Sequence, residues 1–190
     1  MATAPSRTSD FFDQLTRTVE QAREVAQQRF RTLNEDELNR RPAPDKWSVG
    51  QCLEHLNIIG GFYLPEINQR VRSAQERGSR PAETVKSGPI GRRLTAAMLV
   101  PAREKPLKTP QAFAPSGSRL PRTVVEVFLR QLDEMLNLLR AAREVNANAV
   151  RIPNAVIPLV RLRLTDQFAF LVAHMQRHMS QAERVLDGRR

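Results

Sequence analysis

The sequence from residue 165 to residue 187 reads TDQFAFLVAHMQRHMSQAERVLD. Its apolar side chains recur at intervals of three, four or seven residues, which places them on one face of a helix. This stripe consists of Phe168, Leu171, Met175, Ala182 and Val185. Gly188 follows as a stop signal. The segment therefore predicts an amphipathic C-terminal helix, from about Thr165 to Asp187, with one face buried.

Three earlier segments show the same period and predict three further long helices. The first runs from about Asp10 to Thr32, with the stripe Phe11, Leu15, Val19, Ala22, Ala26 and Phe30. The second runs from Ser48 to about Gly78, with the stripe Val49, Cys52, Leu53, Leu56, Ile59, Phe62 and Ile67. The third runs from about Arg122 to Val145, with the stripe Val125, Phe128, Leu132, Met135, Leu139 and Ala142.

Local signals mark where these helices begin and bend. A capping pair joins a polar cap residue to an acidic or amide residue three positions later. Such pairs are Asn34 with Glu37, Ser48 with Gln51, and Thr123 with Glu126. Trp47 precedes the second of them, and we expect it to pack on Cys52 as a hydrophobic staple. Pro65 predicts a kink in the second long helix.

The stretch from residue 78 to residue 122 is a long irregular connection rich in proline. A short helix, from about Ile90 to Val100, is expected inside it. No segment shows the alternation of a half-buried strand. We therefore predict an all-α fold, a four-helix bundle with one long crossover connection. The chain, residues 1–190, is expected to form a single domain with its core at about 10–187.

Composition narrows the setting and the partners. The formal net charge is +10, but no block of five or six basic residues occurs, so we do not expect a dedicated nucleic-acid site. Cys52 is the one cysteine, which excludes an intramolecular disulfide and favours a reducing compartment. No apolar run approaches the roughly 20 residues that span a bilayer. We expect a cytoplasmic protein with no membrane partner.

The spacing of the three histidines of the chain is the main indication of a functional site. His174 and His178 are four residues apart, so they lie one turn apart on one face of the last helix. His55 follows Cys52 by three residues and should also point inward, from a different helix. If the two helices face each other, three imidazoles converge. Three histidines can hold a zinc ion and leave one position for water or substrate.

The same spacing also permits plainer interpretations. A histidine on an apolar helix face is usually a hydrogen-bonded core residue, and a pair four apart often arises by chance. Against this, burying three unrelated imidazoles in one core is costly unless each of them is satisfied. A metal ion would satisfy them, and it could activate water or bind a thiolate.

Two motifs resemble a known family. The runs are KWSVGQCLEHL at 46–56 and AHMQRHMSQ at 173–181, and they resemble helices of DinB-like proteins. The resemblance extends from about residue 10 to residue 186. It implies a four-helix bundle, often dimeric, with a divalent metal ion on His55, His174 and His178. Imidazole ligands make zinc or nickel the expected ion. The broader superfamily includes metal-dependent transferases that act on small thiols.

Four other residues lie close to the histidines in the sequence. Gln181 is one turn after His178 and could orient that ligand or a metal-bound water. Cys52 could be a thiolate ligand, although a small buried apolar residue is more usual. Glu54 lies about 100° around the helix from His55, so direct ligation is not expected. Trp47 fits a helix staple better than a substrate platform.

The resemblance, together with the three histidines, implies a metal-dependent enzyme of thiol-transferase type. Its partners would be a small thiol or an electrophile, and it would form a homodimer. Arginines of the long connection, namely Arg92, Arg93 and Arg103, could bind a substrate carboxylate. Three alternatives stay open: a metal-dependent hydrolase, a non-catalytic dimeric interaction protein of a stress response whose metal site is structural or vestigial, and polyanion binding by the basic surface.

Overall fold

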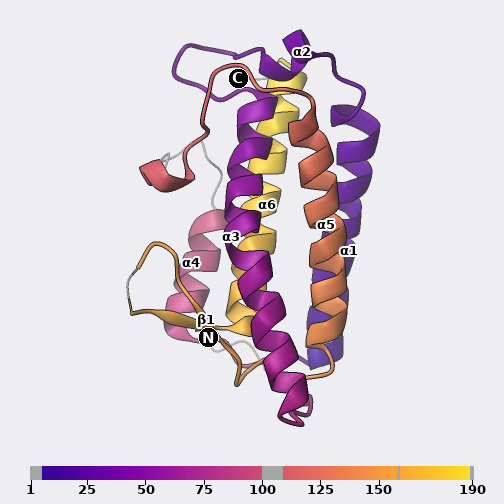
Figure 1. Ribbon diagram of the computed structural model, residues 1–190, viewed down its shortest axis with the longest axis vertical. Coiled ribbons are helices and arrows are strands. Elements are labelled where there is room, and N and C mark those ends of the chain that lie inside the picture. Colours follow the sequence, from indigo (N-terminus) through magenta and orange to yellow (C-terminus); the bar gives the residue numbers. More distant parts are fainter. Residues whose placement is uncertain (1–5, 100–108, 158, 189–190) are drawn as a thin grey trace.

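The computed structural model describes residues 6–99, 109–157 and 159–188. The described chain is mostly helical and carries one small sheet (Figure 1). In chain order the elements are α1 (Thr8–Val25), a π-helical continuation η1 (Ala26–Phe30), α2 (Glu35–Asn39), α3 (Val49–Glu76), α4 (Pro89–Leu99), a 3-10 turn η2 (Gln111–Phe113), α5 (Thr123–Ala142), β1 (Arg151–Pro153), β2 (Arg161–Arg163) and α6 (Leu164–Leu186).

The long helices α1, α3, α5 and α6 run side by side in Figure 1. Helix α3 packs against both α5 and α6, and α1 packs against the same two helices from the other side. The helix α4 lies outside this group and packs against α6. Helix α6 contacts α3, α4 and α1, so much of its circumference is covered. This explains why five of its polar residues are buried, namely Thr165, Asp166, Gln167, His174 and His178.

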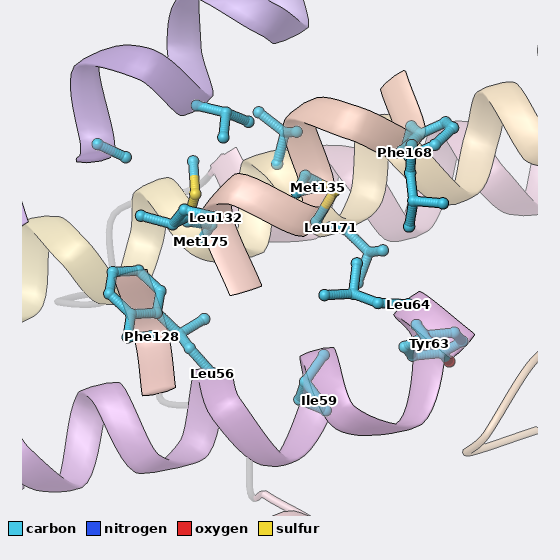
Figure 2. Close-up of a cluster of buried hydrophobic side chains, with 14 of the residues drawn as sticks. Leu56, Ile59, Tyr63, Leu64, Phe128, Leu132, Met135, Phe168, Leu171 and Met175 are labelled. Atoms are coloured by element: carbon cyan, nitrogen blue, oxygen red, sulfur yellow. The ribbon is translucent and has the colours of Figure 1, made fainter. Parts of the chain in front are cut away.

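The core is aliphatic with a few aromatic rings. Figure 2 shows one cluster of it, whose labelled side chains come from α3, α5 and α6. They are Leu56, Ile59, Tyr63 and Leu64 of α3, Phe128, Leu132 and Met135 of α5, and Phe168, Leu171 and Met175 of α6. Each of them is less than one-tenth exposed. Burial of such side chains contributes about 1.5–3 kcal/mol apiece and is the main force that holds the helices together.

Two stripe positions were assigned wrongly from the sequence. Phe12, not Phe11, is fully buried in α1, because its ring packs edge-to-face on Phe168 of α6. In α3, Phe62 is 46% exposed, whereas Tyr63 is 2% exposed. The Tyr63 hydroxyl accepts a hydrogen bond from the backbone N–H of Ala155. Both errors are shifts of one residue, which a helical period alone does not resolve.

The helix starts are confirmed at two of three places. Asn34 with Glu37 and Ser48 with Gln51 form complete capping boxes at α2 and α3. The third box is wrong, because α5 begins at Thr123 itself and its first turn has no side-chain cap. Glu126 instead pairs with Arg31 of the chain segment after α1. Helix α3 continues unbroken through Pro65.

The expectation of a chain without strands is also wrong. Strands β1 and β2 pair antiparallel, with Ile152 opposite Leu162. Both of these side chains are buried, while the residues around them face outward. Strands of three residues are too short to show a recognisable alternation in the sequence, and their pairing depends on contact across the loop.

The connection from residue 78 to residue 122 is partly ordered against the helices. Helix α4 occupies the position expected for its short helix, and Val100 and Arg103 lie outside the described residues. Buried Asp166 of α6 accepts hydrogen bonds from the hydroxyl of Ser87 and the backbone N–H of Gly88, just before α4. These bonds fix the start of α4 on α6. Within the described residues, none of the helices is both long and apolar enough to cross a membrane.

The contact between α4 and α6 makes Gly91 a sensitive position. A Cβ atom at Gly91 would lie 2.3 Å from Cγ and 2.5 Å from Cβ of Asp166. The Cβ of Asp166 is fixed to the backbone of α6, so Gly91→Ala must push the helices apart. We expect it to lower the free energy of unfolding by about 1–3 kcal/mol, measured by urea denaturation.

Gly61 of α3 provides the matched control. The nearest atom to a Cβ there is 3.9 Å away, so Gly61→Ala should be neutral or raise stability by up to about 1 kcal/mol through helix propensity. Equal effects of the two substitutions would contradict the close α4–α6 contact.

Candidate metal centre

The three histidines meet between α3 and α6. His55 lies near the start of α3, and His174 and His178 lie on successive turns of α6. The ring centroids are 4.9 Å apart for His55 and His174, and 4.6 Å apart for each of the other two pairs. One ring nitrogen from each histidine lies within 4.8 Å of the corresponding nitrogens of the other two. The convergence expected from the sequence is therefore present in the fold.

Two local features place the three rings at the same height along the packed helices α3 and α6. The capping box at Ser48 starts α3 at Val49, so His55 follows two turns into the helix. In α6, the spacing of four residues aligns His174 and His178 along the face that packs on α3. The side chains are 4%, 7% and 9% exposed for His55, His174 and His178 respectively. The cluster is thus part of the protein interior rather than of its surface.

Hydrogen bonds determine which nitrogen of two rings carries the proton. Nδ1 of His55 lies 2.7 Å from the backbone oxygen of Phe113. A carbonyl oxygen only accepts, so this Nδ1 donates and Nε2 keeps a free lone pair. Nδ1 of His178 lies 3.1 Å from Oε1 of Gln181, which likewise accepts. Both rings therefore present Nε2 to the cluster, the usual arrangement of a histidine ligand oriented by a second group.

The contact between His55 and His174 matches a metal site in its dimensions. Their Nε2 atoms are 3.1 Å apart. Two nitrogen ligands of a tetrahedral zinc ion, each bound at about 2.0–2.1 Å, lie about 3.3 Å apart. Nδ1 of His174 is buried and has no hydrogen-bond partner among the described residues. The three residues present thus fit a divalent cation in their donor type, their convergence and their spacing.

Burial keeps the three imidazoles uncharged. It lowers the pKa of His178 to about 3, and the repulsion between protonated His178 and protonated His55 adds to this effect. For His174, burial and then the repulsion from protonated His178 and His55 hold the pKa well below its usual value. Burial also lowers the pKa of His55, although the bond to Phe113 opposes the change. Neutral imidazole is the form that binds metal ions.

Cys52, Glu54 and Gln181, the other residues considered as ligands or orienting groups, lie outside the histidine cluster. Cys52 is fully buried, burial raises the pKa of its thiol to about 12, and it is not part of the cluster. This makes a thiolate ligand at Cys52 unfavourable. Glu54 bonds to Ser116 rather than to the cluster. Gln181 contacts His178 as an orienting residue would, through Nδ1.

Two aromatic rings form walls of the cluster. Trp47 stacks on His178 with centroids 5.6 Å apart, and it also contacts His55 at 5.1 Å. Phe170 stacks on His174 at 5.7 Å with nearly parallel rings. The sequence assigned Trp47 a staple role and gave no role to Phe170. A spacing of four residues from His174 to Phe170 was the available signal for the second contact.

The histidine cluster predicts a pH dependence of stability in the metal-free protein. Each folded-state pKa lies below the unfolded value of about 6.5, so the unfolded state binds more protons below that pH. Stability is fully present above about pH 6.5 and falls as the pH decreases, by up to about 1.4 kcal/mol per pH unit for each histidine. Urea denaturation of chelator-treated protein between pH 7 and pH 5 measures it.

A variant with all three histidines replaced by glutamine serves as the control. The chain has no other histidine, and ordinary carboxyl groups titrate mainly below this window. Its stability should be nearly constant between pH 7 and pH 5. A wild-type profile as flat as that of the variant would show that the imidazoles are not buried together.

One family model matches most of the chain. No curated protein and no solved structure shows a significant match to the chain. The family model of the DinB superfamily matches residues 18–182. This range covers most of the chain and includes all three histidines. The resemblance in the two histidine-containing motifs is therefore confirmed, and the chain belongs to the DinB superfamily.

Proposed function

We propose that His55, His174 and His178 hold one divalent metal ion, and that the chain is a metal-dependent enzyme of thiol-transferase type. The observation that carries the proposal is the convergence of three buried, neutral imidazoles within 4.8 Å. The proposal includes the family architecture, a four-helix bundle with one long crossover, as the scaffold that holds the ligands on facing helices.

The donor set favours zinc or nickel among the divalent ions. Imidazole suits zinc, copper, iron and nickel, whereas magnesium and calcium prefer oxygen ligands. The described residues bring no carboxylate and no thiol into the cluster. Three protein ligands leave a coordination position for an exogenous group, which is typical of catalytic rather than structural zinc sites.

A bound ion would supply a Lewis acid that lowers the pKa of a small thiol or of water. The thiol substrate comes from the family resemblance, since the superfamily includes transferases that use small thiols. In this reaction Trp47 and Phe170 would limit the access of water to the cluster, because their rings cover His178 and His174. Arg92 and Arg93 are exposed on α4, where they could bind a carboxylate of the second substrate.

A structural role for the metal is the second candidate. Each histidine is less than one-tenth exposed, and the ligands come from two helices, so an ion would cross-link α3 to α6. In that case the chain would be a non-catalytic interaction protein. A hydrolase would use the same ligands with water in place of the thiol.

We also propose that the protein forms a homodimer, which light scattering of the purified protein tests.

The first prediction from this proposal concerns metal content. Gently purified protein should contain about one zinc or nickel ion per chain by elemental analysis. His55→Ala, His174→Ala and His178→Ala should each abolish stoichiometric binding and turnover of a small thiol with an electrophile. Gln181→Ala should weaken binding by only about 10–100-fold, because it orients a ligand without being one.

Glutamine replacements of the same histidines control for the cavity that alanine leaves. Stoichiometric metal in all of these variants would refute ligation by the three histidines.

Removal of the metal by a chelator distinguishes the enzyme from the protein with a structural metal. A large fall in melting temperature with no reaction in a screen of thiols and electrophiles favours the structural role, whereas loss of turnover with a small change in melting temperature favours the enzyme.

A further inference from the structure

A short segment before α5 runs along the first two turns of α3. We call this segment, residues 113–117, the strap. It contains Phe113, whose backbone oxygen accepts the hydrogen bond from Nδ1 of His55. The Phe113 side chain is 9% exposed and its ring contacts Phe62 of α3. The strap thus supplies the group that orients one of the proposed ligands, although it is 58 residues away in sequence.

The far end of the strap is fastened by a carboxylate. Glu54 accepts one hydrogen bond from the backbone N–H of Ser116, at 2.8 Å, and another from the Ser116 hydroxyl, at 2.6 Å. Two bonds from one carboxylate to one residue restrain both its position and its direction. Hydrogen bonds to an ionised group are roughly twice as strong as neutral ones. Glu54 therefore makes two charge-assisted attachments to a single residue of the strap.

A third attachment links the strap to the start of α3. Nε2 of Gln51 donates to the backbone oxygen of Gly117 at 3.0 Å. The Oε1 atom of the same side chain accepts from the backbone N–H of Ser48 in the capping box. Gln51 precedes Glu54 by three residues and His55 by four, so it lies one turn before both of them on the same helix. The strap and the beginning of α3 consequently form one hydrogen-bonded unit.

We propose that Glu54 is a positioning residue of the metal centre. By holding Ser116 it keeps the Phe113 oxygen opposite Nδ1 of His55, and this fixes the proton on Nδ1 and directs Nε2 toward His174. The role is distinct from ligation, since the carboxylate bonds to the strap and not to the cluster. The inference rests on the proposed function where it concerns metal affinity, but the orientation of His55 is a property of the metal-free chain.

Four variants test whether the bonds between Glu54 and Ser116 orient His55, or whether loss of any carboxylate from α3 has the same effect. Glu54→Ala removes both bonds. Glu54→Gln removes the charge but leaves an oxygen that can accept. Ser116→Ala keeps the charge and removes the hydroxyl bond. Glu66→Ala is the matched control, because Glu66 is also on α3 but pairs with Arg70, four residues along the same helix.

Two measurements are made on each variant. The first is affinity for zinc, by competition with a chromogenic chelator. The second is the tautomer of His55 in the metal-free protein, from imidazole nitrogen chemical shifts. Wild type should carry the His55 proton on Nδ1. Glu54→Ala should lower zinc affinity about tenfold and populate the Nε2-protonated form.

Ser116→Ala and Glu54→Gln should lie between Glu54→Ala and wild type in both measurements, and Glu66→Ala should equal wild type. An unchanged His55 tautomer in Glu54→Ala would overturn the proposal, as would equal losses of affinity in Glu54→Ala and Glu66→Ala. If Glu54→Ala does not fold, Ser116→Ala and Glu54→Gln decide the tautomer. Absence of zinc binding by wild type would refute the metal centre alone, because the tautomer is read without metal.

Discussion

Three imidazole rings are buried at one point between α3 and α6, and their need for partners constrains the elements around them. A buried polar ring is costly unless its nitrogens have partners, so each ring restricts what can surround it. His55 requires an acceptor beside Nδ1, and the strap places a backbone oxygen there. His178 has Gln181, one turn later on its own helix. The position of α3 along α6, the start of α3 and the path of the strap are all tied to these contacts.

The site is asymmetric in the way its members are held. His55 is oriented by a distant segment and His178 by its own helix, whereas Nδ1 of His174 has no partner among the described residues. The orientation of His174 comes from packing and from the contact of its Nε2 with Nε2 of His55, since Phe170 stacks on its ring and the other two imidazoles are steeply inclined to it. Three different physical means therefore direct three chemically identical side chains. Such a division matters for a metal centre, because ligand orientation and not ligand type alone sets affinity.

Much of the fold follows from local sequence. The predictions that were wrong share one physical cause. The apolar period located the long helices, and the capping residues located the starts of α2 and α3. The choice between Phe11 and Phe12, or Phe62 and Tyr63, depends on a partner from another element, Phe168 or Ala155. The pairing of β1 with β2 depends on contact across a loop. Each of these features is decided by residues remote in sequence, which a periodic pattern cannot identify.

Two features of the site could be predicted from the residues alone, because helical geometry fixes the direction of each side chain: His174 and His178 share one helical face, and His55 points inward from another helix. The family membership could likewise be recognised from short motifs around these residues. The packing of the helices was needed to establish that the three rings meet, which nitrogen each of two rings presents, and that Phe113, Trp47 and Phe170 surround them. The reason is physical: a backbone oxygen is available at every residue, and only the packing of the helices selects the one that faces His55.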